Sequence, residues 1–157
     1  MMAMKEAQAL EMVSQFHQLF DAPILDIPQI PADRAALRVN LLEEEINELK
    51  QAIADGDLVE VVDAFADLQY VLSGAILEFG LGDRFADIFA EVQRSNMSKA
   101  CSTLEEAQAT VEHYKTTKWF DAHIVTKWDQ YLVYRTQDHK VLKSVNYSPA
   151  DIGKFLD

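Results

Sequence analysis

Two groups of acidic residues are the side chains of this sequence best suited to chemistry. The first group is Glu44, Glu45 and Glu48, and the second is Glu60, Asp63 and Asp67. Carboxylates lose hydration free energy when they leave water, and like charges a few ångströms apart raise one another's pKa. Two facing acidic groups therefore pack poorly by themselves, but they suit a divalent cation held between them. Carboxylate oxygens favour Mg²⁺, with Mn²⁺ as the alternative.

Both acidic groups fall in segments with helical periodicity. The first segment spans about residues 33–54 and the second about residues 58–79, with Gly56 as a stop signal between them. On a helix, Glu44 and Glu48 are i,i+4 neighbours, and the second acidic group occupies one narrow stripe. The second helix is otherwise apolar over most of its circumference, which predicts burial on nearly all sides. A solvated polar face is the plain alternative for the first group, but it explains the second group poorly.

The remaining segments predict a helical body followed by a small β appendage. Further helices are expected at about residues 5–20, 83–93 and 103–116, and a stretch with three prolines separates the first helix from the second. Short strands are expected at residues 123–128, 131–135 and 140–143, with a last short helix that starts at Ser148 and Pro149. We expect residues 1–118 to form the helical core and residues 119–157 the appendage, as parts of one domain.

Composition excludes several classes of protein. The chain has 157 residues, enough for one domain with its own core. Its net charge of −12 disfavours sequence-independent binding of nucleic acid. No apolar run is long enough to span a membrane, no secretory signal is recognisable, and the single cysteine, Cys101, excludes an internal disulfide. We therefore expect a cytoplasmic protein with no membrane or nucleic-acid partner.

The spacing of the first acidic group is also the basis of a family resemblance. Glu44-Glu45-x-x-Glu48 followed by an acidic helix resembles the motif of the all-α nucleoside triphosphate pyrophosphohydrolases, the group of MazG and phosphoribosyl-ATP pyrophosphohydrolase. The second half of the motif fits either Glu60 and Asp63 or Asp67, so the sequence leaves open which of these three acids bind metal. Residues 92–99 are similar to the segment that closes the helical core in the phosphoribosyl-ATP pyrophosphohydrolase-like branch, and residues 143–151 resemble its closing tail more weakly.

The resemblance implies a fold, a reaction and a set of site residues. The fold would be a MazG-like helical bundle, mainly α. The residue pattern adds completion of the bundle by oligomerisation and a small C-terminal β-hairpin or meander with a short final helix. The reaction would be Mg²⁺-dependent hydrolysis of a nucleoside triphosphate between the α and β phosphates, giving monophosphate and pyrophosphate. Both acidic groups would hold the metal, and Glu45 or Glu44 would act as general base. The phosphates would bind Asn96 and Lys99, with Arg38 or Lys143 assisting.

Three further expectations remain open at this stage. Phe16, His17 and Tyr70 are candidates to contact the substrate, although aromatic side chains at helical spacing more often belong to a core. The apolar surface of the helix at residues 58–79 predicts a homo-oligomer, a dimer or a dimer of dimers. The substrate would be that of a house-cleaning enzyme or a dUTP- or dCTP-directed enzyme. The alternatives are phosphoribosyl-ATP hydrolysis in histidine synthesis or a non-catalytic acidic helical module that binds a protein.

Overall fold

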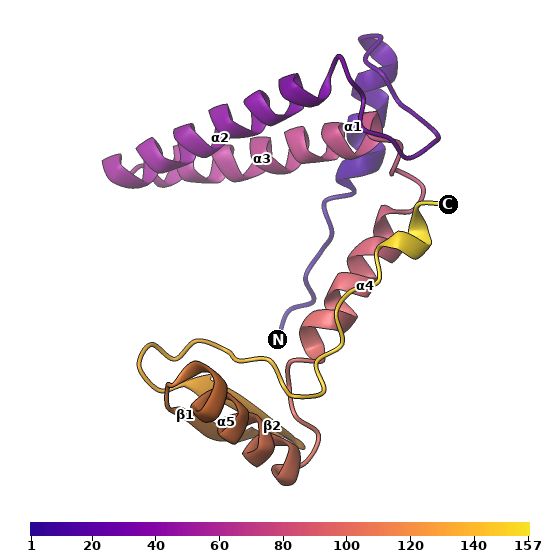
Figure 1. The fold of residues 1–157 in the computed structure, drawn as a ribbon. Helices are drawn as coiled ribbons and strands as arrows, with labels where there is room; N and C mark the ends of the chain where they lie inside the picture. The colour runs from indigo at the N-terminus through magenta and orange to yellow at the C-terminus, as the bar shows by residue number, and fades with distance from the viewer. The chain divides into compact units, whose positions relative to one another are not determined.

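A computed structural model describes residues 1–157. It contains five α-helices, one two-stranded antiparallel hairpin and a short 3₁₀ turn, which confirms the mainly α prediction (Figure 1). The chain divides into two compact units, Met1–Phe85 with Asp157 and Ala86–Leu156. The boundary predicted after residue 118 falls inside the second unit, between the last helix and the hairpin. No helix is both long enough and apolar enough to cross a membrane.

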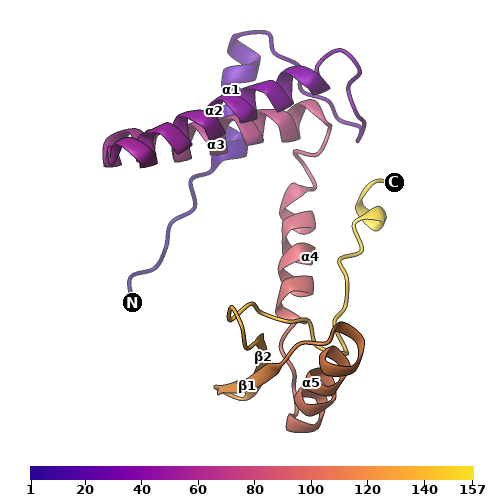
Figure 2. The same cartoon turned by 60° about the vertical axis from the view of Figure 1, so that its left-hand side comes forward.

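The first unit consists of α1 (Ala9–Leu19), α2 (Ala35–Asp55) and α3 (Leu58–Glu78). In Figures 1 and 2, α2 and α3 lie side by side as an antiparallel pair joined by a tight turn. Gly56 has a φ of 68° in this turn, a left-handed conformation that glycine adopts without steric cost. Asp57 then caps α3, because its side chain accepts the Val59 and Glu60 N–H groups at 3.0 and 3.2 Å. The predicted bounds of both helices are correct to within two residues, whereas α1 begins four residues later than predicted.

The proline-rich stretch before α2 has no regular structure, but its backbone completes the end of α3. The N–H of Leu25 donates to the carbonyl of Leu77, and the N–H of Gln29 donates to the carbonyl of Phe79, both at 3.0 Å. The last carbonyls of a helix have no partner within the helix. Gln29 supplies a partner for the carbonyl of Phe79, while the carbonyl of Leu77 also accepts the N–H of Gly80 at 3.2 Å. Gly80 permits the close approach, since a Cβ there would lie 2.1 Å from the carbonyl oxygen of Ile27.

A single chain leaves much of the apolar surface of α3 exposed. The helix buries Ala64, Ile76 and Leu77, but Val59 is 75% exposed and Phe65 is 56% exposed. Burial on nearly all sides is therefore not reached in one chain, and the predicted oligomer remains a prediction. Burial of the face would need a partner that the single chain does not supply.

The second unit contains α4 (Phe85–Met97), α5 (Leu104–Lys118), β1 (Ala122–Lys127) and β2 (Gln130–Arg135). The strands pair in antiparallel register with Lys127 opposite Gln130, and α5 lies beside the hairpin (Figure 2). Their shared core is built on four buried residues, Cys101, Ala107, Val133 and Leu142. Thr103 caps α5 as its spacing predicts, because its hydroxyl accepts the N–H of Glu106 at 3.1 Å. Helix α4 ends at Met97, one turn beyond the end predicted at residue 93.

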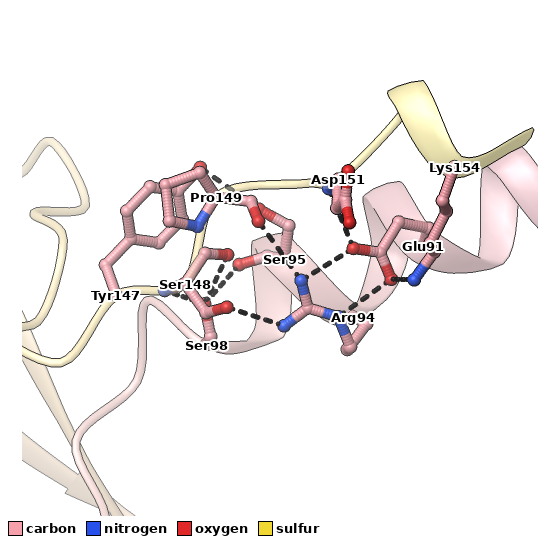
Figure 3. A network of polar contacts seen from close by, with 9 residues as sticks. All are labelled: Glu91, Arg94, Ser95, Ser98, Tyr147, Ser148, Pro149, Asp151 and Lys154. Atoms are coloured by element: carbon pink, nitrogen blue, oxygen red, sulfur yellow. Dashed lines mark hydrogen bonds and ion pairs between the residues drawn. The ribbon is translucent and has the colours of Figure 1, made fainter. Parts of the chain in front are cut away.

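The C-terminal tail departs from the sequence prediction in two places. Residues 140–143 form no strand, and only an isolated bridge joins Val141 to Tyr134. The last helix does not start at Ser148 and Pro149, since the only helical turn in the tail is 3₁₀, at Gly153–Phe155. Side chains of α4 and of the following Ser98 hold the tail extended instead. Ser98 Oγ accepts the N–H of Ser148 at 2.9 Å, and Glu91 Oε1 accepts the N–H of Asp151 at 2.9 Å (Figure 3).

Arg94 lies at the centre of this contact between α4 and the tail. Its guanidinium donates to both carboxylate oxygens of Glu91 at 2.8 and 2.7 Å. It also donates to the Ser148 hydroxyl at 3.0 Å and to the Pro149 carbonyl at 3.2 Å (Figure 3). The hydrogen bonds from Arg94 and from the Asp151 backbone lower the pKa of Glu91 to about 2. The tail is therefore fixed to α4 by charged hydrogen bonds.

Candidate functional site

The contact between α2 and α3 determines which acids face each other. At one end of the pair, Arg38 donates to the carbonyl of Val71 at 2.8 Å. The same side chain fills the space beside Gly74, where a Cβ would lie 2.0 Å from Arg38 Nη2. Seven residues make about two helical turns. Glu45 lies two turns after Arg38 on α2, and Asp67 lies two turns before Gly74 on α3. Because the helices are antiparallel, Glu45 therefore lies opposite Asp67.

Glu45 is the centre of the resulting cluster. Its side chain is half-buried, and its Oε2 atom is buried without a hydrogen-bond partner. Burial raises the pKa of Glu45, and the negative charges of four neighbours raise it further: Glu48, Asp67, Glu44 and Asp63. Five of the six predicted metal ligands thus form one electrostatic cluster, which we call the acidic cluster.

Glu60 is the predicted ligand that the structure leaves outside the acidic cluster. Two further helical turns bring it opposite Ala52, beyond the last glutamate of α2. It is exposed in the first turn of α3 and is not among the charges that act on Glu45. The sequence could not rank Glu60 against Asp63 and Asp67, because the alignment of two helices is a tertiary property. The structure associates Asp63 and Asp67 with the first acidic group.

The donor set of the acidic cluster fits a hard divalent cation. It contains carboxylates only, and an unpartnered buried carboxylate oxygen beside four like charges requires a positive charge nearby. No basic side chain reaches Glu45 to provide one. Mg²⁺ and Mn²⁺ prefer such oxygen ligands. In the side-chain positions of this structure, no three of these groups converge closely enough to form a coordination shell.

Arg38, a predicted phosphate ligand, belongs to a buried ion-pair network. Its Nε lies 3.7 Å from Oε2 of Glu78, a residue that is completely buried. Arg34 donates to the other oxygen of Glu78 through Nε at 2.9 Å and through Nη2 at 2.6 Å. Burial lowers the pKa of Arg38, while the hydrogen bond to Glu78 raises the pKa of Arg34. Sequence reasoning overlooked Glu78, although a single acid within the apolar run Ile76–Phe79 was the available signal.

The structure brings two of the predicted base contacts together near the acidic cluster. The rings of Phe16 and Tyr70 pack edge to face with centroids 5.7 Å apart, and both side chains remain partly exposed. Tyr70 lies on α3 one turn beyond Asp67, so the two residues share a face of the helix. His17 is buried, and its Nδ1 lies 2.9 Å from the carbonyl oxygen of Pro23. Because a carbonyl can only accept, Nδ1 carries the proton of this hydrogen bond.

The predicted phosphate contacts Asn96 and Lys99 lie in the second unit, at the end of α4. Lys99 Nζ donates to Asn96 Oδ1 at 2.9 Å, and both side chains line a hollow of about 220 Å³. Lys143 is not part of this lining. Its Nζ lies 4.5 Å from the ring centroid of Tyr147. The structure therefore joins Asn96 to Lys99 and gives Lys143 a different neighbour.

Comparison with known proteins identifies the family. Residues 13–96 match the family model described as phosphoribosyl-ATP pyrophosphohydrolase, and this span is more than half of the chain and includes both acidic groups. The chain belongs to the phosphoribosyl-ATP pyrophosphohydrolase family. This family is part of the MazG-like all-α nucleoside triphosphate pyrophosphohydrolase superfamily, as the acidic motif predicts.

Similarity to another protein extends beyond residues 13–96, the span of the family match. An uncharacterized protein of Acanthamoeba polyphaga mimivirus is 22% identical to the chain. That alignment covers 90% of this chain and 87% of the relative. The family model, in contrast, ends at residue 96, so Lys99, the hairpin and the tail lie outside it.

Proposed function

We propose that this family member is a metal-dependent nucleoside triphosphate pyrophosphohydrolase that releases pyrophosphate and a nucleoside monophosphate. Membership of the family supports hydrolysis of a phosphoanhydride bond in a nucleotide. The observation that carries the metal dependence is the unpartnered, buried oxygen of Glu45 among four other carboxylates. A chain with a net charge of −12 repels free nucleotides, and a divalent cation in the acidic cluster would reverse the local charge.

In this proposal the acidic cluster holds Mg²⁺ or Mn²⁺ through Glu44, Glu45, Glu48, Asp63 and Asp67. A bound divalent cation neutralises phosphate charge and lowers the pKa of water. Phosphoryl transfer otherwise asks a protein mainly for positioning and electrostatic stabilisation. We assign the general base to Glu45, with Glu44 as the alternative, because Glu45 lies at the centre of the acidic cluster.

Asn96 and Lys99 are the proposed contacts for the phosphates. Lys99 offers three donors and a full positive charge, and the amide of Asn96 can donate to a phosphate oxygen. Phe16 and Tyr70 are the proposed contacts for the base, since their partly exposed rings pack against each other and Tyr70 lies one turn from Asp67. Arg38 would act indirectly, because its guanidinium is already held by Val71 and Glu78.

A substrate panel tests the proposal. The full-length protein is incubated with canonical nucleoside triphosphates, dUTP, dCTP, modified triphosphates and phosphoribosyl-ATP, each with Mg²⁺, with Mn²⁺ or with EDTA. We expect release of pyrophosphate and monophosphate from at least one substrate and no release in EDTA. Release of orthophosphate from a triphosphate, or undiminished release in EDTA, would contradict the proposed reaction.

Phosphoribosyl-ATP is the second candidate substrate, and the description of the matching family favours it. Preference for it over every triphosphate in the panel would establish that reading. A non-catalytic acidic module is the third reading, and thermal unfolding separates it from both enzymes. A catalytic site should gain stability with Mg²⁺, and more with Mg²⁺ and a non-hydrolysable triphosphate together. A protein-binding module should show no such additional gain.

A further inference from the structure

The hollow in the second unit has a lining unlike the rest of this acidic chain. It lies between the end of α4 and the β-hairpin and has a volume of about 220 Å³. Four apolar side chains line it, together with two lysines, two amides and two aromatic rings: Lys99, Lys127, Asn96, Gln130, Trp128 and Tyr134. No Asp or Glu is among its lining residues, although acids outnumber bases by 26 to 14 in the chain. This local reversal of charge favours an anion.

Both lysines of the hollow lack an acidic partner. Lys99 donates to the amide oxygen of Asn96, and Lys127 Nζ lies 5.4 Å from the ring centroid of Trp128. Neither takes part in any of the ion pairs of the structure. A phosphate group would supply the missing counter-charge, since ammonium groups form short, charge-assisted hydrogen bonds with phosphate oxygens.

Trp128 occupies a position that folding alone does not explain. It is a turn residue of the hairpin with a φ of 55°, a region that bulky residues rarely adopt. Short hairpin turns usually place Asn, Asp or Gly in such conformations. The side chain is 86% exposed, so burial does not offset the backbone cost. Strained residues of this kind cluster at binding sites.

We propose that the hollow binds one nucleotide in addition to the substrate whose base contacts Phe16 and Tyr70. The base of this added nucleotide stacks on Trp128, and its phosphate lies between Lys127 and the shared Lys99. Aromatic rings stack on any nucleobase, and neighbouring cations bind its phosphate. The hollow is smaller than the roughly 300–1,000 Å³ of pockets that enclose whole drug-sized ligands, so it accommodates one ring system with its phosphate at the rim. The identity of the ligand rests on the proposed function, in which nucleotides are substrate and product. The hairpin, outside the family match at residues 13–96, would then contribute to specificity.

A second hollow provides an internal control. It has a volume of about 440 Å³ and is lined by α5 and by Trp119, which is 88% exposed and also has a positive φ, 60°. Glu112 and Asp121 line it together with Lys115. Acids outnumber bases in this lining, so it does not select an anion. Each of the two tryptophans of the chain therefore reports on a different hollow.

Tryptophan fluorescence tests the proposal in two variants with one tryptophan each. Trp119→Phe retains Trp128, and Trp128→Phe retains Trp119. Each full-length variant is titrated in EDTA, which prevents metal-dependent hydrolysis, with AMP, GMP, CMP and UMP in turn. We expect saturable quenching of Trp128 by at least one nucleotide and no saturable quenching of Trp119. Inorganic phosphate alone should not quench, because quenching requires a stacked base.

Charge and stacking are then tested separately. Lys127→Gln in the Trp119→Phe background should weaken binding of the same nucleotide by at least about fivefold, as loss of one favourable contact predicts. The parent nucleoside, which lacks the phosphate, should bind more weakly by a similar factor. Circular dichroism of each variant confirms that the fold is retained. If Trp128→Phe does not fold, the test of the proposal is the nucleotide affinity of Trp119→Phe compared with that of Trp119→Phe carrying Lys127→Gln.

Several outcomes would overturn the proposal. These are no saturable quenching of Trp128, equal quenching of both tryptophans, or an unchanged affinity in Lys127→Gln. Tighter binding of a short single-stranded oligonucleotide than of the mononucleotide would assign the hollow to nucleic acid instead. The test also separates this inference from the proposed function. Quenching without hydrolysis of any substrate would uphold the hollow and reject the enzyme, while hydrolysis without quenching would do the reverse.

Discussion

A buried carboxylate oxygen without a hydrogen bond, such as Oε2 of Glu45, is costly until a positive group reaches it. In the second unit the charges without an opposite partner are positive, because Lys99 and Lys127 have no acidic partner. These two observations at single residues define the two kinds of ligand proposed for the protein. The ligand proposed for the first is a metal ion, and the ligand proposed for the second is a nucleotide.

Removing one carboxylate from the acidic cluster should abolish activity. Glu48→Gln and Asp67→Asn each remove a charge while preserving size, so we expect pyrophosphate release to fall at least about 100-fold, the usual cost of losing an electrostatic contact to the transition state. Far-ultraviolet circular dichroism should remain helical in both variants. Glu43→Gln, an exposed neighbour on the same helix, is the matched control and should keep full activity. Full activity in both test variants would refute the metal assignment.

Glu45→Gln should change stability in opposite directions with and without metal. In EDTA the variant should have a higher melting temperature than wild type, because the substitution removes a partly buried charge that four neighbours repel. With Mg²⁺ it should lose the increase in melting temperature that metal gives to wild type. Thermal unfolding at neutral pH measures both effects. A lower melting temperature in EDTA would show that the carboxylate is already compensated in the metal-free protein.

At the scale of elements, the molecule depends on contacts between helix ends and distant segments. Arg34 precedes the first turn of α2, and Glu78 is the last residue of α3. Their ion pair therefore joins the two helices at one end of the antiparallel pair that α2 and α3 form. The same carboxylate lies 3.7 Å from Arg38, which in turn occupies the space left by Gly74. This network aligns Glu45 with Asp67 without contacting either residue. It therefore positions the acidic cluster.

Substitution of Glu78 should destabilise the first unit strongly. Glu78→Ala leaves the buried guanidinium of Arg38 without its counter-charge, and breaking a buried pair from one side costs about 3–5 kcal/mol. Urea unfolding followed by circular dichroism measures the loss in the free energy of unfolding. Glu60→Ala, an exposed acid on the same helix, should change stability by less than about 0.5 kcal/mol. Equal effects of the two substitutions would show that the network contributes nothing.

The contact between α4 and the tail should weaken in acid. The pKa of Glu91 is lowered from 4.5 to about 2 in the folded protein. A lowered folded-state pKa contributes stability above the unfolded-state value of 4.5, and this contribution disappears as the pH falls toward 2. The difference in urea midpoint between wild type and Glu91→Gln should thus be constant near neutral pH and shrink below pH 4.5. A difference that persists unchanged at about pH 2.5, near the lower end of this window, would contradict the role of the charge.

At the scale of the whole molecule, the exposed face of α3 predicts self-association. Leu58, Val59, Val62 and Phe65 are all more than half exposed in one chain, and exposed apolar patches of this kind mark interfaces. We expect light scattering after size-exclusion chromatography to show at least a dimer at micromolar concentration. Phe65→Glu should shift the protein toward monomer, whereas Glu43→Gln should not. A monomeric wild type would contradict this prediction.

How well the sequence predicted the structure depended on the range of the interactions involved. Gly56 and Thr103 end and begin helices through contacts within a few residues, so the sequence located these points correctly. The tail could not be predicted in this way, because Ser148 is hydrogen-bonded to Arg94 and Ser98, which lie some fifty positions earlier in the chain. The choice among Glu60, Asp63 and Asp67 likewise required the alignment of two helices. The hollow beside Trp128 needed three segments brought together by folding.

The backbone that completes α3 has a consequence for how the chain is made. A ribosome adds roughly 5–20 residues per second, and Leu25 precedes its partner Leu77 by about fifty residues. The segment that finishes the helix is thus synthesised on the order of 3–10 s before the helix end exists. Pro23, Pro28 and Pro31 prevent it from joining a helix or a central strand during this interval. These prolines preserve an unpaired stretch of chain until its partner is translated.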